Sequence, residues 1–413
     1  MSSKLDQLLA RLCPDGVEYR PLKHFATVSR GGSFQKKDFV PSGFPCIHYG
    51  QIHTKFDIFV DQAITFLTND VAERQRKAES GAIIMAVTSE NLDDVCKAVA
   101  WLGNSEVAVS GHSAIIHHHQ NPKYLSYYFN SIAFSAQKRK LAHGTKVIEV
   151  TPNDLLEVCV PVPPLEVQNE IVRILDKFTE LTAELTAELT ARRKQYGYYR
   201  DLLLNFDNRY KGGVKHHLLS DVFDMRNGYT PSKKHNEYWE NGVIPWFRME
   251  DIRENGHILT DAVQHITPTA VKKSGLFPAN SIIVSTTATI GEHALILTPF
   301  LANQQFTCLT IKSKWKNKLE PKFAFYVCFK LATWCLRNVN NGGFASVDMK
   351  RFRAFPIPIP PLEVQNETVR ILDKFSTLCN DLTSGLPAEI EARKRQYEYY
   401  RDKLLSFKPL KRA

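Results

Sequence analysis

Two stretches of the chain carry apolar residues at alternating intervals of four and three positions, the spacing with which a helix buries one narrow seam. The seam consists of Ile174, Phe178, Leu181 and Leu185 in the first stretch, with Leu189 four positions further on, and of Ile371, Phe375, Leu378 and Leu382 in the second. A helix of about 40 residues is about 60 Å long, and its seam needs a partner. We therefore expect two long helices packed as an antiparallel coiled coil that holds globular domains apart. The alternative is that each helix packs on its own domain.

The sequence also predicts where these helices begin and where one of them breaks. Pro164 and Pro361 fit the first turn of a helix, where a missing N–H costs nothing. In the first stretch, Thr-Ala-Glu-Leu occurs twice in tandem at residues 182–189, without a helix breaker. In the second stretch, Gly385 and Pro387 occupy this place and should interrupt the helix. The first helix should therefore be continuous and the second broken.

Short apolar runs elsewhere predict strands. They are GAIIMAV (81–87), SAIIHHH (113–119), NSIIVSTT (280–287) and FTCLTIK (306–312). Each pair of runs is followed by a helical pattern, KYLSYYFNSIAFSAQKRK in one case and KFAFYVCFKLATWCLRN in the other. Mixed signals of this kind predict α/β or α+β domains.

These elements recur because the chain consists of two copies of one plan. VPVPPLEVQNEIVRILDKF (160–178) returns as IPIPPLEVQNETVRILDKF (357–375), and QYGYYRDLLLNF (195–206) returns as QYEYYRDKLLSF (396–407). The register continues into the divergent parts, where Gly31 matches Gly228. An internal pseudo-twofold repeat follows. It predicts a first globular domain with its N-terminal segment at 1–160, a helical spacer at 161–212, a second globular domain at 213–357 and a second helical spacer at 358–413.

Charge and composition favour one class of binding partner and one cellular location. The formal charge of +10 and the pI near 9.1 favour a polyanionic partner without establishing one. The eight cysteines form no Cys-x-x-Cys pair and are interpreted as reduced, partly buried side chains. No apolar run is long enough to span a bilayer, and the first residues lack an apolar signal core, so a cytoplasmic location is expected.

Catalytic motifs are not found in the sequence. There is no G-x-G-x-x-G and no G-x-x-x-x-G-K-[ST] motif, and the Pro-Pro pairs occur only at the two helix starts. Asp15, Glu18 and Arg20 faintly resemble a nuclease carboxylate set but are interpreted as part of a turn. Neighbouring residues of His117–His119 would point to opposite faces of a strand and could not surround one ion. We expect no catalytic residue, no metal site and no cofactor in this chain.

Two variable domains separated by two nearly identical helical segments resemble the specificity subunit of a type I DNA restriction-modification enzyme. The resemblance covers essentially the whole chain and is carried by PPLEVQNE-x-VRILDKF, QY-x-YYRD-x-LL, the tandem TAEL units and NGYTPSKKHNEYWENGVIPW (227–246). It implies that each variable domain is a target-recognition domain for one half of a bipartite DNA site. It further implies binding of two modification subunits, which carry S-adenosylmethionine, and of two restriction subunits, which use ATP and Mg²⁺. The chain itself would be noncatalytic.

Specificity of this kind needs side chains that contact phosphates and base edges, and the entry loops of both domains supply them. The candidate DNA-binding residues are Arg30, Lys36, Lys37, His48, Gln51, His53, Arg226, Asn227, Lys233, Lys234, Arg248 and Glu250. For each of them, an ordinary solvated side chain is the alternative. Lys138–Lys140 is interpreted as a basic helix end, and Asn340–Phe344 as an Asn/Gly turn that could approach DNA.

The resemblance also gives the tandem repeat a meaning, because in that family the number of such units sets the length of unread DNA between the half-sites. Two other functions remain open from the sequence. One is a coiled-coil protein scaffold without DNA specificity. The other is a fused DNA methyltransferase or nuclease with unrecognised motifs.

Overall fold

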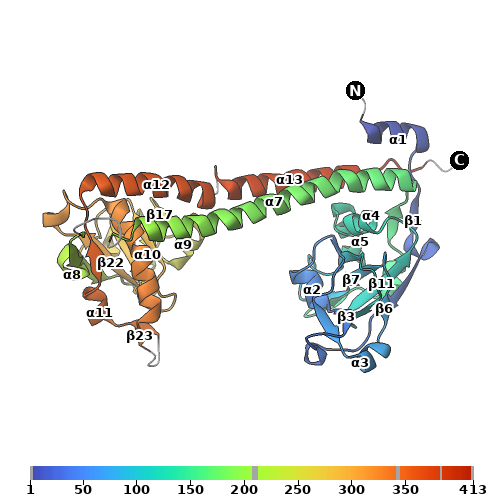
Figure 1. The fold of residues 1–413 in the computed structure, drawn as a ribbon, viewed down its shortest axis with the longest axis horizontal. Helices are drawn as coiled ribbons and strands as arrows, with labels where there is room; N and C mark the ends of the chain where they lie inside the picture. The colour runs from blue at the N-terminus through green and yellow to red at the C-terminus, as the bar shows by residue number, and fades with distance from the viewer. Residues whose placement is uncertain (1–2, 207–212, 341–344, 382–383, 411–413) are drawn as a thin grey trace. The chain divides into compact units, whose positions relative to one another are not determined.

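A computed structural model describes residues 3–206, 213–340, 345–381 and 384–410 (Figure 1). The chain forms two compact units: unit 1 contains Met1–Glu184 and Ile390–Ala413, and unit 2 contains Leu185–Glu389. Each unit thus combines one globular half with parts of both helical segments. The boundaries expected after residues 160, 212 and 357 stay predictions.

Unit 1 is built on two sheets. The five-stranded sheet has the order β2 (Ala26–Arg30), β11 (Ser113–His118), β7 (Ile83–Ala86), β9 (Lys97–Trp101) and β4 (Phe59–Val60). The four-stranded sheet has the order β5 (Thr65–Leu67), β3 (Phe44–Ile47), β10 (Val107–Val109) and β6 (Lys77–Ala78). The predicted runs at 81–87 and 113–119 are therefore strands β7 and β11.

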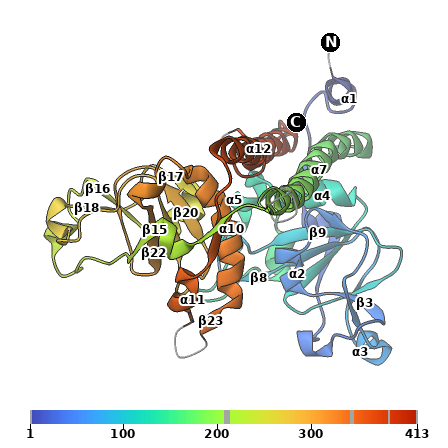
Figure 2. The same ribbon diagram turned by 60° about the vertical axis from the view of Figure 1, so that its left-hand side comes forward.

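The central strands of unit 1 are apolar throughout because both of their faces are covered. Ile83 and Met85 of β7 belong to the core under α4 (Pro122–Phe129), whereas Ile84 and Ala86 belong to the core that includes Ile52 of α2 (Tyr49–Thr54). Figure 2 shows α4 and α2 on opposite sides of β9. This double coverage explains why the run has no alternation of polar and apolar residues.

Unit 2 repeats this plan. Its five-stranded sheet has the order β15 (Phe223–Asn227), β22 (Phe306–Ile311), β19 (Ser281–Ser285), β20 (His293–Ile296) and β17 (Ile258–Leu259). A three-stranded sheet contains β18 (His265–Ile266), β16 (Ile244–Phe247) and β21 (Leu301–Ala302), beside α9 (Met249–Asn255). The runs at 280–287 and 306–312 are thus strands, and the expected mixed fold is confirmed.

The helix predicted after these strands differs between the units. In unit 2 it is one helix, α10 (Pro321–Arg337), whereas in unit 1 it is divided into α4 and α5 (Ile132–Leu141). The division occurs at Ser131, whose hydroxyl accepts a hydrogen bond from the Phe134 N–H and caps α5. A capping serine offers the backbone this local alternative to a continuous helix.

The long helices follow the predicted pattern of continuity and interruption. The first, α7, is continuous from Leu165 to Leu203, whereas the second is broken into α12 (Leu362–Asn380) and α13 (Leu386–Leu404). Gly385 lies in the break, where a Cβ atom would come within 2.5 Å of the Thr377 carbonyl oxygen. The helix starts need a small correction: Pro361 is the cap residue before α12, and α7 begins one residue after Pro164.

Antiparallel packing is visible inside each unit. In unit 1, Phe178 of α7 stacks on Tyr400 of α13, with ring centroids 5.4 Å apart. In unit 2, Tyr199 of α7 stacks on Phe375 of α12 at 5.6 Å, and the Cys379 thiol, whose pKa burial raises, lies within electrostatic reach of Arg193. Residue 193 precedes 199 whereas residue 379 follows 375, so the two helices run in opposite directions.

The seam is less complete than expected. Leu189 is buried, while Ile174, Phe178, Leu185, Ile371 and Phe375 are half-buried. The equivalent residues Leu181 and Leu378 are 36% and 39% exposed, which differs from the expectation of a closed seam. Leu382 lies outside the described residues. The seam residues Phe178 and Phe375 stack on tyrosines that the predicted seam did not include.

The starts of the helices pack on their own globular halves, which is the alternative we considered above. The Asp176 carboxylate of α7 accepts hydrogen bonds from Lys123 Nζ and the Tyr127 hydroxyl, both at 2.8 Å. Asp373 of α12 accepts the same pair from Lys322 and Tyr326, at 2.8 and 2.6 Å. Both modes of packing therefore occur, on different parts of each helix.

A glutamine that occurs in both copies of the repeat makes a second matched connection. The Gln168 side-chain oxygen accepts a hydrogen bond from the Asn121 N–H at 3.0 Å, and its nitrogen donates to the Pro163 carbonyl at 2.8 Å. Gln365 accepts from the Glu320 N–H at 2.9 Å and donates to the Pro360 carbonyl at 2.7 Å. In both copies, the same glutamine hydrogen bonds therefore connect the start of the long helix to a globular half whose sequence differs.

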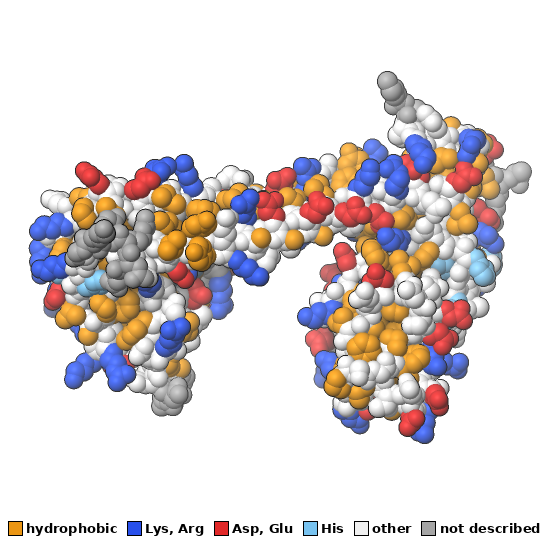
Figure 3. Space-filling view, viewed as in Figure 1, with side chains coloured by type: hydrophobic (Ala, Val, Ile, Leu, Met, Phe, Trp, Pro, Cys, Tyr) orange, Lys and Arg blue, Asp and Glu red, His pale blue; other side chains and the backbone are white. Residues whose placement is uncertain are grey.

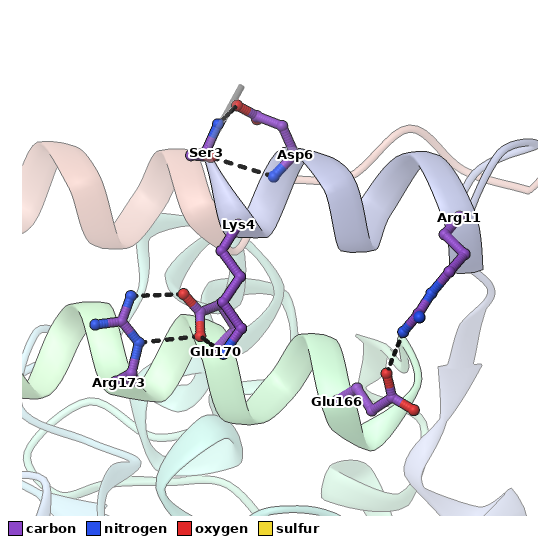
Figure 4. A network of polar contacts seen from close by, with 7 residues as sticks. All are labelled: Ser3, Lys4, Asp6, Arg11, Glu166, Glu170 and Arg173. Carbon is purple, nitrogen blue, oxygen red and sulfur yellow. Dashed lines mark hydrogen bonds and ion pairs between the residues drawn. The ribbon is translucent and has the colours of Figure 1, made fainter. Parts of the chain in front are cut away.

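The N-terminal helix α1 (Lys4–Leu12) packs along the start of α7 (Figure 4). Arg11 pairs with Glu166 at 2.6 Å, and Lys4 pairs with Glu170 at 3.0 Å. Glu170 also receives two hydrogen bonds from Arg173, and these bonds together with Lys4 lower its pKa to about 2. Within the described residues, no helix combines the length and apolar character needed to cross a membrane.

Candidate nucleic-acid interface

In each unit, the end of the first sheet strand meets a short loop from the neighbouring strand, and a glycine permits the contact. A Cβ atom on Gly31 would lie 2.2 Å from the Ser110 carbonyl oxygen, and one on Gly228 would lie 2.2 Å from that of Ala302. Only glycine allows backbones to approach so closely. The two matched glycines thus define equivalent edges, which we call the loop edge of each unit.

Most predicted site residues lie near these edges, but several have structural roles. Arg30 donates to the Gly111 carbonyl at 2.7 Å and pairs with Glu149 at 2.7 Å. Arg226 donates to the carbonyls of Ser274 and Gly275, and its guanidinium lies 4.1 Å from the centre of the Phe277 ring. Both arginines bind neighbouring backbone carbonyls at the loop edge, and their contact with DNA stays a prediction.

His48 and Gln51 cap helix α2. His48 Nδ1 accepts a hydrogen bond from the Gly50 N–H at 3.2 Å, and Gln51 accepts from the His48 N–H at 2.9 Å while donating to Thr65 at 2.9 Å. His48 is only 8% exposed, and burial, followed by the charges of Lys36 and His112, lowers its pKa. The cap uses His48 Nδ1 and both polar atoms of the Gln51 side chain, and contact of these two residues with DNA stays a prediction.

Arg248 occupies the equivalent position at the start of α9. Its backbone N–H donates to Asp251 at 2.6 Å, and its side chain lies 3.9 Å from Glu250 and packs over Trp246. Unlike His48, Arg248 is partly exposed, and its Nε has no hydrogen-bond partner among the described residues. This Nε atom is buried, so only the rest of the partly exposed Arg248 side chain and the exposed Glu250 face solvent, and their contact with DNA stays a prediction.

Four of the predicted DNA-binding residues are exposed lysines. Lys36 and Lys37 are exposed on the short helix η2 (Lys36–Asp38), and Lys233 and Lys234 are exposed at the matching place in unit 2. None of the four forms an ion pair with another described residue. They are flexible, hydrated cations suited to phosphate groups.

The structure adds two residues to the loop edge of unit 1. The Tyr49 ring lies 4.6 Å from His48, 4.9 Å from His112 and 6.3 Å from His53, measured between ring centroids. His112 is exposed, whereas His53 is half-buried, and burial lowers the pKa of His53. The predicted residue His53 thus belongs to an aromatic group that also contains the unpredicted Tyr49 and His112.

In unit 2, the corresponding loop carries amides. Exposed Gln304 accepts a hydrogen bond from Thr230, and the neighbouring Asn303 and Gln305 bond to each other. Asn227, a predicted residue, accepts a hydrogen bond from Thr307 at 3.0 Å. The sequence signal that could have revealed His112 and Gln304 is their place just before the matched strands β11 and β22.

Other sequence interpretations can also be placed. Lys138 donates to the carbonyls of Asp93 and Val95, and Arg139 pairs with Asp93, so this basic helix end is structural. Burial lowers the pKa of His118 to about 4, and the described residues contain no group of side chains arranged to hold a metal ion. Residues 341–344 of the predicted Asn/Gly turn lie outside the described residues.

Comparison with known proteins agrees with this two-unit organisation. The family profile described as "Type I restriction modification DNA specificity domain" matches residues 14–192 and 213–392. The chain is 58% identical over 197 residues to the type I restriction enzyme EcoprrI specificity subunit of Escherichia coli, covering 46% of this chain and 49% of that protein. It is 43% identical over 256 residues to the EcoR124I/EcoR124II specificity subunit of the same species, covering 60% and 61%. It thus spans about half to three fifths of these curated relatives.

Two solved structures share the fold. One, described as concerning complex assembly and conformational transition of the type I R-M system, has a TM-score of 0.64 at 18% identity and covers 95% of this chain and 98% of its own. The other, the HsdS subunit from Thermoanaerobacter tengcongensis, has a TM-score of 0.50 at 18% identity, with coverage of 95% and 97%.

Proposed function

Because the chain belongs to the type I restriction-modification DNA specificity family, we propose that it is the noncatalytic subunit that recognises DNA for such a complex. Each unit reads one half of a bipartite double-stranded site. The observation that carries this proposal is the pair of equivalent loop edges, which share a backbone architecture but differ in side chains. Equivalent scaffolds with different side chains are suited to two different half-sites.

The two kinds of side chain at the edges divide the work of recognition. Lys36 and Lys37 in unit 1, and Lys233 and Lys234 in unit 2, hold phosphates and set the position of the duplex. Base edges are read by groups that have directional donors and acceptors. His112 serves in unit 1, and Gln304 in unit 2, where an amide can pair with adenine.

Partner subunits supply the chemistry. We propose that two modification subunits, carrying S-adenosylmethionine, bind one chain, and that two restriction subunits, using ATP and Mg²⁺, join the complete complex. Support comes from apolar residues exposed at equivalent helix positions: Tyr198 and Tyr399 are 65% and 61% exposed, and Leu165 and Leu362 are exposed as well. Repeated exposed surfaces suit two copies of one partner.

The decisive experiment maps adenine methylation in a genome that carries the complete system, with a strain lacking only this chain as the control. We expect one bipartite sequence with a fixed unread spacer, methylated only when the chain is present. If the control strain, which lacks the chain, kept the same site-specific methylation, the proposal would be contradicted. Methyl transfer or DNA cleavage by the isolated chain would instead support the fused-enzyme alternative, and equal affinity of the complex for scrambled DNA would support the scaffold.

A further inference from the structure

Unit 2 carries a second basic surface away from its loop edge. We call it the lysine face and define it by Lys215, Lys314, Lys316, Lys318, Lys350 and Arg353. All six side chains are exposed, and none forms an ion pair with another described residue. Figure 3 shows Lys and Arg side chains along the outer left and lower left of this unit, where α8 (Leu219–Val222) and α11 (Met349–Arg353) lie in Figure 1.

The lysine face rests on an ordered base. Trp315 donates from its indole nitrogen to the Asp221 carbonyl at 3.0 Å, and its ring lies 4.6 Å from His217. The Lys318 carbonyl accepts from Gln365 at 2.8 Å, which ties the lysine segment to the start of α12. Helix α11 packs against α8, and so brings its own cations to the same region. A preformed base reduces the ordering cost when the lysines engage a ligand.

Few carboxylates lie near the lysine face, and two of them already interact with cations that do not belong to it. Asp224 lies 4.0 Å from Lys312, and Asp348 caps α11 while lying 3.6 Å from Arg351. Neither carboxylate pairs with a member of the lysine face. A third carboxylate, that of exposed Asp221, lies within electrostatic reach of His217, as do Lys215 and Lys314. Six cations against three carboxylates leave an excess of positive charge, which favours a polyanion.

Unit 1 lacks this surface at the equivalent place. Between β11 and α4 it has only residues 119–121, whereas residues 312–320 connect β22 to α10 in unit 2. In place of α11 it has α6 (Pro152–Leu156), with Asp154 within it and Glu157, paired with Lys23, just after it. The lysine face is therefore a property of unit 2 and not a necessary part of the repeated fold.

The lysine face lies at the opposite end of β15 from the loop edge, where bases are read. Strand β15 pairs with β22 so that Phe223 opposes Ile311 and Asn227 opposes Thr307. The loop edge lies at the Asn227 end and the lysine segment at the Phe223 end. The strand length between them is about 13 Å, or about four base steps of 3.4 Å. A duplex that is held at the loop edge and follows β15 and β22 reaches the face within about four base steps.

We propose that the lysine face binds the phosphate backbone of duplex DNA outside the bases read by unit 2. The composition favours DNA over an acidic protein, because lysine is depleted at protein–protein interfaces and is a common phosphate ligand. Such contacts add affinity and salt dependence but carry no sequence information. This inference rests on the proposed function, since the complex must first be positioned by its half-sites.

The test compares K314Q/K316Q with K140Q/K408Q, which removes two exposed lysines from unit 1. Binding of both complexes, assembled with modification subunits, is measured on specific and scrambled duplexes over a range of salt. We expect K314Q/K316Q to lower the slope of log affinity against log salt by up to about 2, because each lost phosphate contact contributes about 0.9. The ratio of specific to scrambled affinity should stay unchanged. Phosphate-ethylation interference should lose signals outside the read bases.

A slope and interference pattern equal to those of the control would overturn the inference while leaving the proposed function intact. Normal DNA binding with weakened attachment of a partner subunit would also overturn it, in favour of a protein-binding face. By contrast, a wild-type complex without preference for any sequence would refute the proposed function itself. Far-UV circular dichroism and thermal unfolding of both variants check that the fold is retained.

Discussion

At the scale of single residues, position in the fold separates recognition from support. His48 and Gln51 have side chains that suit base recognition, yet they cap α2. His112 and Gln304 have equally suitable side chains and lie exposed on the loop edges. Residue type alone does not distinguish these cases, because a capping bond and a base contact use the same atoms.

The phosphate role of the loop-edge lysines gives the first prediction. K36Q/K37Q should weaken binding of the complex to specific and scrambled duplexes by similar factors and lower the salt slope by up to about 2. Titration of labelled duplexes at several salt concentrations measures both effects. The control is K140Q/K408Q. A selective loss of the specific site alone would mean that these lysines read bases.

Gln304 should behave in the opposite way. Gln304→Ala should relax preference at one base pair of the half-site read by unit 2, at a cost of about 1–3 kcal/mol, because a bidentate amide contact is lost. The other half-site should keep its preference. Affinity measurements on duplexes that carry every single base change provide the test, and Gln305→Ala is the neighbouring control. Unaltered preference at every position would exclude Gln304 from base readout.

Glu170 provides a pH-dependent prediction at the same scale. Its folded-state pKa of about 2 lies below the ordinary value of 4.5, so its ion pairs contribute stability above about pH 4.5. This contribution is lost as pH falls from 4.5 towards 2. Chemical denaturation should therefore show E170Q less stable than wild type at neutral pH, with the difference shrinking in acid. E367Q is the matched control, because Glu367 is exposed and pairs with Arg370 alone among the described residues.

At the scale of elements, the two long helical segments repeat the same motifs but differ in continuity. Asp176 and Asp373 make the same joint with their globular halves, so the repeat preserves attachment. The Thr-Ala-Glu-Leu tract keeps α7 continuous, whereas the segment containing Gly385 separates α12 from α13. Local sequence decides this difference, because glycine and proline act directly on the backbone.

Deleting Thr186–Leu189 should shorten the unread DNA between half-sites by about one base pair. Four residues span about 6 Å of helix and slightly more than one turn, so the side-chain faces nearly keep their register. Methylation mapping of the deletion system measures the spacer. Replacing the same four residues by alanines keeps the length and should keep the spacer. An unchanged spacer in the deletion would argue against a length-setting role.

At the scale of the whole molecule, duplication supplies two loop edges and two exposed tyrosines from one plan. The side chains of the two units differ at the loop edges, where DNA would bind. They match where the long helices attach to the globular halves. This distribution suits a subunit that presents different DNA contacts on repeated attachment surfaces. The lysine face adds an asymmetry that the duplication itself does not require.

The exposed tyrosines lead to a prediction about stoichiometry. Y198A or Y399A should each weaken one of two attachments of modification subunits, while the double variant should weaken both, since each removes an exposed aromatic anchor. Native mass spectrometry at a series of subunit concentrations measures the bound copies. Y198F and Y399F, which keep the rings, should assemble normally. Full assembly of the double alanine variant would place the partner elsewhere.

The sequence by itself determined the duplication, the strand positions, the continuous first helix and the break at Gly385, because these depend on local periodicity and backbone chemistry. It did not determine which cationic or amide side chains remain available. Arg30 is bound to Gly111 and Glu149 from distant parts of the chain, and Leu181 is exposed although its spacing matches the seam. Only tertiary structure decides such cases, because availability depends on contacts between residues that are remote in sequence.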